Sequence, residues 1–183
     1  MKKNAVLAIT RTAVMIAILV MIQFITKSFG QYVTGSLVNL VLAVAALTIG
    51  LWEGIIVAAV SPFFAFMFGI GPAFIQIVPF VALGNAVLVV VLWLFAGREK
   101  EFTSKSLIKG YAGAVAASAA KFLTLWVGVT KISFLLIPGI KEAQIEKMTA
   151  MFTWPQLVTA LIGMIVAMSV VPQIKRALKK SKN

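Results

Sequence analysis

The amino-acid sequence predicts an all-α integral membrane protein, a single six-transmembrane-helix bundle with its N- and C-termini in the cytoplasm. Of its 183 residues, 61% are hydrophobic and 12% are charged, and the mean hydropathy is +1.04. Glu53 is the only charged residue between Lys27 and Arg98. A water-soluble fold must cover itself with polar groups, and this composition does not supply them.

Six apolar runs are long enough to cross a bilayer, which takes about 20 residues of helix. The first carries Arg11 near its start, where the side chain can reach the headgroups, and ends before Lys27. The second is short but uncharged, and the third ends before the glycine- and proline-containing turn 69–72. The predicted spans are residues 5–26, 36–50, 52–68, 73–96, 107–129 and 154–174.

Local features characterise the later elements. Pro79 lies inside the fourth span and predicts a kink or an irregular first segment there. Small residues in 112–120 let the fifth helix approach its neighbours closely, and Pro155 suits the first turn of the sixth. Segment 139–152 mixes apolar and charged residues and predicts a short amphipathic helix at the interface. We expect one membrane domain over residues 1–183.

The basic residues set the expected orientation, because Lys and Arg gather on the cytoplasmic side of membrane proteins. With six spans and both termini inside, four lie outside: Lys27, Lys131, Lys141 and Lys147. Twelve lie inside: Lys2, Lys3, Arg11, Arg98, Lys100, Lys105, Lys109, Lys175, Arg176, Lys179, Lys180 and Lys182.

The residue inventory excludes several functions. The chain has no Cys and no His, and its five acids are the whole carboxylate supply, so we expect no metal site, no cofactor and no intrinsic catalysis. The net charge is +12, but the basic residues stand mostly at the ends of apolar runs. Nucleic-acid binding needs one contiguous basic face, so we expect no nucleic-acid partner.

Polar groups inside the spans point to a binding site, because a buried polar group without a partner costs several kcal/mol in a bilayer. Placed by depth, nearly all of them fall in the outer half of the membrane, together with Gln23 and Gln156 at outer helix ends. This predicts a polar pocket open to the outside, roofed by the first outer loop and by segment 139–152. The candidate substrate-binding residues are Gln31, Tyr32, Asn39, Gln76, Asn85, Lys121, Trp126 and Trp154.

Structural interpretations stand beside these functional ones. Lys121 either extends outward to the headgroups or lines a cavity, where it favours a ligand with a carboxylate, a phosphate or an electron-rich ring carbonyl. Asn39 and Asn85 can hydrogen-bond between helices without touching a ligand. Trp126 and Trp154 are also typical of aromatic residues at a membrane interface.

The chain resembles the substrate-binding S components of energy-coupling factor (ECF) transporters, through which prokaryotes take up vitamins. The likeness covers nearly the whole chain: its size, its six helices and a glycine-containing first outer loop at 30–35. Ala13 and Ala17, within the stretch Arg-Thr-Ala-Val-Met-Ile-Ala at 11–17, match the Ala-x-x-x-Ala strip of the family's first helix. Small residues at i and i+4 form a flat strip on which another helix can pack.

The resemblance implies a mechanism. The subunit captures a vitamin or precursor from outside, docks through Ala13 and Ala17 on a transmembrane coupling protein driven by two cytoplasmic ATPases, and releases its cargo inward. The chain has no Gly-rich loop ending in Gly-Lys-Ser/Thr, so ATP hydrolysis is expected of the partners. The mixture of aromatic, amide and Lys121 side chains suits a small heterocycle or a small carboxylate.

Two other functions remain open. A stand-alone secondary transporter or channel is one, although such proteins commonly show inverted repeats and polar groups near the midplane, and neither is visible here. A membrane scaffold is the other, in which the buried polar residues only join helices.

Overall fold

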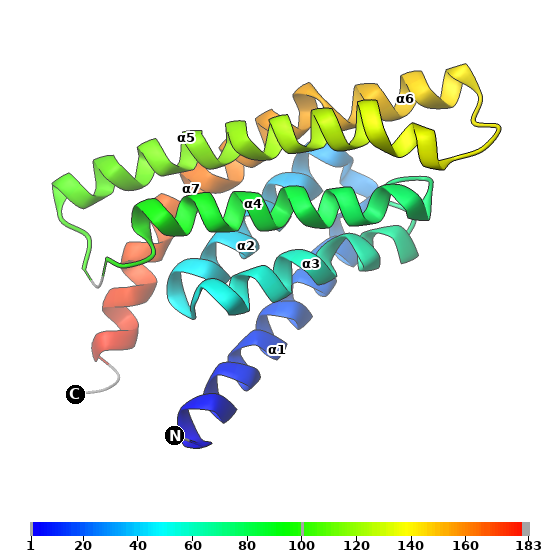
Figure 1. The fold of residues 1–183 in the computed structure, drawn as a ribbon. Coiled ribbons are helices and arrows are strands. Elements are labelled where there is room, and N and C mark those ends of the chain that lie inside the picture. The colour runs from blue at the N-terminus through cyan, green and yellow to red at the C-terminus, as the bar shows by residue number, and fades with distance from the viewer. Residues whose placement is uncertain (1, 100, 181–183) are drawn as a thin grey trace.

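The computed structural model describes residues 2–99 and 101–180, and every long element in them is a helix (Figure 1). Short 3-10 or π turns join some of the helices, and the described residues form no strand. The helices are α1 (Lys2–Thr26), α2 (Gln31–Thr48), α3 (Leu51–Met67), α4 (Val78–Ala96), α5 (Ser104–Val127), α6 (Glu142–Phe152) and α7 (Trp154–Lys180).

Five helical stretches of the described chain are long and apolar enough to cross a membrane. They contain α1, α2, α4, α5 and α7; α3 is also apolar but shorter, at 17 residues. At a rise of 1.5 Å per residue, 17 residues span about 26 Å, near the lower limit for a membrane helix. The structure therefore agrees with a multi-pass membrane protein.

α2 lies at the centre of the bundle and α1 at its edge (Figure 1). Ten of the 18 residues of α2 are buried, and the helix packs most extensively along α7, as α4 does along α5. Gly163 makes the contact of α7 with α2 possible, because a Cβ there would lie 2.5 Å from the Ser36 carbonyl oxygen. In α1 the buried side chains among those described are Thr12, Leu19 and Gln23.

Several helix ends differ from the predicted spans. α2 begins at Gln31 rather than at residue 36, because Gly30, with φ of 83°, turns the chain straight into the helix. α5 begins earlier than predicted, at Ser104, since Thr103 and Ser106 form a capping box. Its α-helical part ends at Val127, after which 128–132 forms a π turn.

Pro79 and Pro172 lie in different parts of their helices. Pro79 lies in the first turn of α4, after the 3-10 turn Ile75–Ile77, so the irregular first segment is confirmed and no kink inside α4 is needed. α7 continues past the predicted end at residue 174 to Lys180, with Pro172 inside it.

α1 begins and α7 ends at one end of the bundle, and α6 lies at the other (Figure 1). At the terminal end, Lys175 donates to the Glu99 carbonyl oxygen at 2.6 Å, and Lys179 pairs with Glu101. The hydrogen bond from Lys179 holds the pKa of the Glu101 carboxyl below its usual range.

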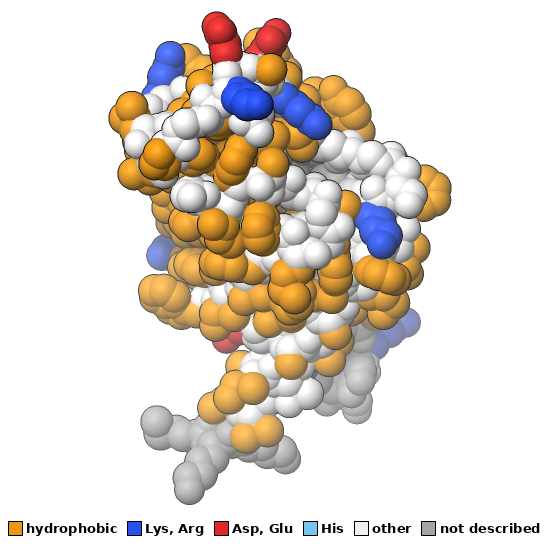
Figure 2. Space-filling view, turned by 90° about the vertical axis from the view of Figure 1, so that its right-hand side faces the viewer, with side chains coloured by type: hydrophobic (Ala, Val, Ile, Leu, Met, Phe, Trp, Pro, Cys, Tyr) orange, Lys and Arg blue, Asp and Glu red, His pale blue; other side chains and the backbone are white. Residues whose placement is uncertain are grey.

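α6 is amphipathic, as predicted. Met148 and Phe152 are buried in a small apolar cluster with Leu125 and Val129 of the α5 region. Its charged residues, among them Glu142 and Glu146, are exposed. Figure 2 shows acidic and basic side chains gathered at the top of the molecule, above a mostly hydrophobic body.

Candidate functional site

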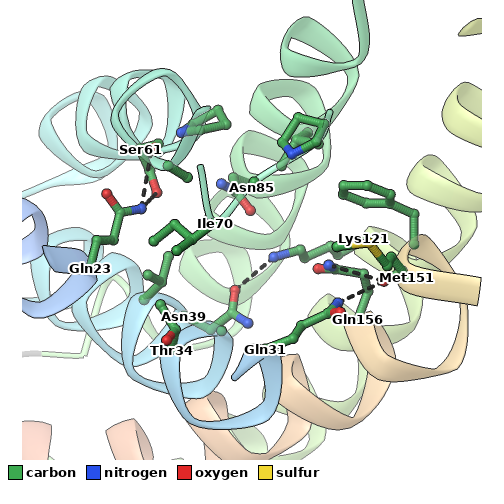
Figure 3. A pocket seen from close by; sticks show the side chains of 18 residues that line it. Gln23, Gln31, Thr34, Asn39, Ser61, Ile70, Asn85, Lys121, Met151 and Gln156 are labelled. Carbon is green, nitrogen blue, oxygen red and sulfur yellow. Dashed lines mark hydrogen bonds between the residues drawn. The ribbon is translucent and has the colours of Figure 1, made fainter. Parts of the chain in front are cut away.

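A cavity of about 90 Å³ lies among the helices, near the end of the bundle that carries α6 (Figure 3). Every long helix of the described chain contributes to its wall. Its polar lining residues are Gln23, Gln31, Thr34, Asn39, Ser61, Asn85, Lys121 and Gln156.

Lys121 of α5 is the only charged residue that lines this cavity within the described chain. Its side chain is 3% exposed, and its Nζ donates to Oδ1 of Asn39 on α2 at 2.8 Å. Figure 3 shows the two side chains reaching toward each other at the cavity. Of the two interpretations of Lys121, the structure places it in the cavity wall and not at the headgroups.

Gln23 of α1 faces Ser61 of α3. Its Nε2 donates to the carbonyl oxygen and to Oγ of Ser61, each at 3.1 Å. A carbonyl oxygen only accepts hydrogen bonds, so the amide nitrogen must face it. Oε1 of Gln23 therefore points away from Ser61, and it is buried with no hydrogen-bond partner.

Asn85 of α4 makes a similar contact with α3. Pro62 has no N–H, so the Ala58 carbonyl one turn earlier lacks its usual helical donor. Nδ2 of Asn85 lies 3.4 Å from that oxygen and supplies a donor. Oδ1 of Asn85 is buried without a partner, as Oε1 of Gln23 is.

The end of α6 is joined to two helices through one backbone carbonyl. Gln31 of α2 donates to the Met151 oxygen at 2.7 Å, and Gln156 of α7 donates to the same oxygen at 3.5 Å. Met151 and Phe152, with the connection 70–72 between α3 and α4, line the cavity. Of the predicted first outer loop, Gln31, Thr34 and Gly35 line the cavity, but they belong to α2 and not to a loop.

The structure brings Gln31, Asn39, Asn85 and Lys121 together and leaves four other candidate residues outside the cavity lining. Tyr32, Gln76, Trp126 and Trp154 are exposed. Tyr32 follows Gln31 in a helix and not in a loop, so it points about 100° away from it. Trp154 packs on Phe122 with ring centroids 5.6 Å apart, on the outside of the bundle.

Sequence reasoning missed Ser61 and the 70–72 connection as parts of the wall. Thr34 and Met151 lie in the two segments predicted to roof the pocket but were not singled out. One signal was available for Ser61: it precedes a proline inside an apolar span, where freed backbone groups need new partners. No signal in the sequence indicates that the Met151 backbone oxygen accepts hydrogen bonds from two side-chain amides.

Ala13 and Ala17 of α1 are both exposed. The strip is therefore not used for packing inside the chain. Ala13 also lines a shallow surface groove between α1 and α3.

The cavity wall carries groups that can bind a solute. Within residues 2–99 and 101–180, no three of the His, Cys, Asp or Glu side chains gather at a place that could hold a metal ion. None of the chain's five acids lines the cavity. What the wall offers is one ammonium group, several amides and hydroxyls, and apolar surface.

A cavity with a polar lining among apolar helices, with buried hydrogen-bonding atoms that lack partners, is typical of a membrane protein that binds a solute. Residues 7–174 match the family of the ECF transporter, substrate-specific component. The chain belongs to this family, which confirms the resemblance seen in the sequence. Its members are substrate-binding transporter subunits, not themselves enzymes, and membership implies association with the ECF coupling and ATPase modules. No curated protein and no solved structure matches the chain.

Proposed function

We propose that the chain is the substrate-capture subunit of an ECF importer in a prokaryotic cell membrane. It binds a small water-soluble vitamin or vitamin precursor from outside and delivers it inward after docking on the coupling protein. The observation that carries the proposal is the cavity with a polar lining, in which Gln23 Oε1 and Asn85 Oδ1 have no partner.

Each unpartnered buried acceptor destabilises the protein without its solute by about 1 to 3 kcal/mol. A solute that donates to these oxygens removes that cost, so the cavity favours polar solutes over apolar ones. Gln31, Asn39, Asn85 and Lys121 are the predicted binding residues that line it, and Gln23, Ser61 and Gln156 join them.

The placement of the cavity supports capture from outside. α1 begins and α7 ends at the end of the bundle opposite α6 (Figure 1), and ten of the 15 basic residues at described positions belong to the side of the termini. The positive-inside rule then assigns that side to the cytoplasm and the α6 end to the exterior.

Docking is assigned to Ala13 and Ala17. Both are exposed on the helix at the edge of the bundle, so a helix of the coupling protein can pack there without disturbing the cavity. ATP binding and hydrolysis belong to two cytoplasmic ATPases attached to that coupling protein.

Uptake in cells tests the proposal. The chain is expressed with and without the coupling protein and ATPases, and the small molecule retained by the purified chain is identified by mass spectrometry. We expect uptake of that molecule only when all modules are present. Uptake by the chain alone would identify a stand-alone transporter, and a chain that retains and transports nothing would be a scaffold.

A further inference from the structure

We propose that the ligand of this cavity is a compact monocarboxylate that carries N–H or O–H donors on the side away from its carboxylate. The inference rests on the proposed function, in that it takes the cavity to be a solute site. It follows from the charge, the hydrogen-bonding capacity and the volume of the cavity wall.

The charge of the cavity wall calls for an anion. Lys121 is 3% exposed, and the structure gives its ammonium one acceptor, Asn39 Oδ1. An ammonium has three N–H donors, so two remain for a ligand, and a carboxylate can accept both. No carboxylate of the described chain lies within salt-bridge distance of Lys121. A buried ion without a counter-ion is strongly destabilising, and the anion of a ligand relieves this.

A single negative charge fits better than two. Lys121 is the only charged residue in the lining formed by the described residues. A phosphate monoester carries about −1.5 to −2 charges at pH 7, so one ammonium would leave part of that charge unpaired in the protein interior. A carboxylate balances the ammonium and leaves no excess charge.

The remaining groups call for donors. Gln23 Oε1 and Asn85 Oδ1 are buried acceptors without partners, and their amide nitrogens are held by the Ser61 and Ala58 carbonyls. Rotating either side-chain amide by 180° would place its oxygen against the carbonyl oxygen that its nitrogen now contacts. The two amide oxygens therefore stay in place, and a ligand must supply a donor to each of them. Figure 3 shows Gln23 across the cavity from Lys121, with Asn85 between them. The ligand's carboxylate therefore lies toward α5 and its donors lie toward α1 and α4.

The volume limits the size. A cavity of about 90 Å³ has room for roughly six to nine water molecules, which corresponds to a ligand on the order of ten non-hydrogen atoms. Large vitamins with several rings would extend beyond this cavity or displace side chains of its wall.

The test uses a defined mixture of water-soluble vitamins and precursors in matched forms. It contains pantothenate with its alcohol panthenol, nicotinate with nicotinamide, 4-aminobenzoate with its amide, and pyridoxine with its 5′-phosphate. Purified protein is incubated with the mixture, and retained compounds are measured by mass spectrometry. The variants are Lys121→Met, which removes the buried charge, and Lys131→Met, the same change at an exposed lysine.

We expect the wild type to retain a donor-bearing monocarboxylate over its neutral partner. Lys121→Met should weaken binding of that compound by at least about 30-fold, or about 2 kcal/mol, and Lys131→Met should leave it unchanged. Replacing a buried charge by Met preserves packing, and thermal unfolding of the variant checks this.

The outcomes separate two failures. Retention of a neutral compound, of the phosphate, or of nicotinate as a carboxylate without donors overturns this inference while the cavity remains a solute site. Equal binding by wild type and Lys121→Met also overturns it. Retention of nothing from the mixture by the wild type overturns this inference too, and the proposed function itself fails only if the uptake experiment also finds no retained and transported compound.

Discussion

Asn85→Ala tests two roles of one side chain: its nitrogen donates to a backbone carbonyl of α3, and its oxygen borders the cavity. The nitrogen of the Asn85 amide lies 3.4 Å from the Ala58 carbonyl oxygen, which lacks a helical donor because residue 62 is proline. The oxygen of the same amide has no partner and borders the cavity. We therefore expect Asn85→Ala to lower both the stability of the protein and its affinity for ligand.

The two effects have different magnitudes. Losing the donor leaves the Ala58 carbonyl buried and unpaired, which costs about 1 to 3 kcal/mol, and the long 3.4 Å contact places the loss near 1 kcal/mol. For a chain of this length that lowers Tm by about 2 to 4 °C. Losing the oxygen removes one hydrogen bond to the ligand, and the same 1 to 3 kcal/mol weakens binding roughly 5- to 150-fold.

A double-mutant cycle with Pro62→Ala separates the two roles. In a Pro62→Ala protein, the new backbone N–H at residue 62 can bond the Ala58 carbonyl, so Asn85→Ala should lower Tm less there than in the wild type. The affinity loss should stay the same in both backgrounds. Thermal unfolding in detergent gives Tm, and calorimetric titration with the compound retained from the vitamin mixture gives Kd. An equal drop in Tm in both backgrounds would refute the donor role, and an unchanged Kd would refute the ligand contact.

Three further predictions follow from the topology, the edge helix and the end of α6. A cysteine placed by Ser104→Cys should resist an impermeant thiol reagent in intact cells and react after lysis, because the start of α5 is expected in the cytoplasm; labelling in intact cells would reverse the orientation. Ala17→Trp should abolish assembly and uptake but leave ligand binding intact. The control Ala119→Trp, at an exposed position of α5, should leave assembly, uptake and binding unchanged; normal uptake by Ala17→Trp contradicts docking there. Gln31→Ala removes the 2.7 Å bond to the Met151 oxygen and should speed amide exchange in α6, and unchanged exchange would mean that its apolar contacts alone hold the segment.

The membrane class, most of the spans and the family could be predicted from the sequence alone. Spans are readable because each helix must match the bilayer thickness with its own apolar residues, a requirement local to about 20 positions. Asn39, Asn85 and Lys121 were found in the same way, since polar groups are rare inside such runs. The amphipathic segment 139–152 was visible for a similar reason, because its periodicity is local.

Which polar residues share one cavity was decided by the tertiary structure. Gln31 faces the cavity and Tyr32 does not, although they are neighbours in the chain, because successive residues of a helix point about 100° apart. The rotation of α2 depends on contacts with other helices, such as the close approach at Gly163, and its own residues do not encode it. The pairing of Asn85 with the carbonyl freed by Pro62 likewise joins two helices. Composition determined what is buried in the membrane, and packing between helices determined which buried groups meet.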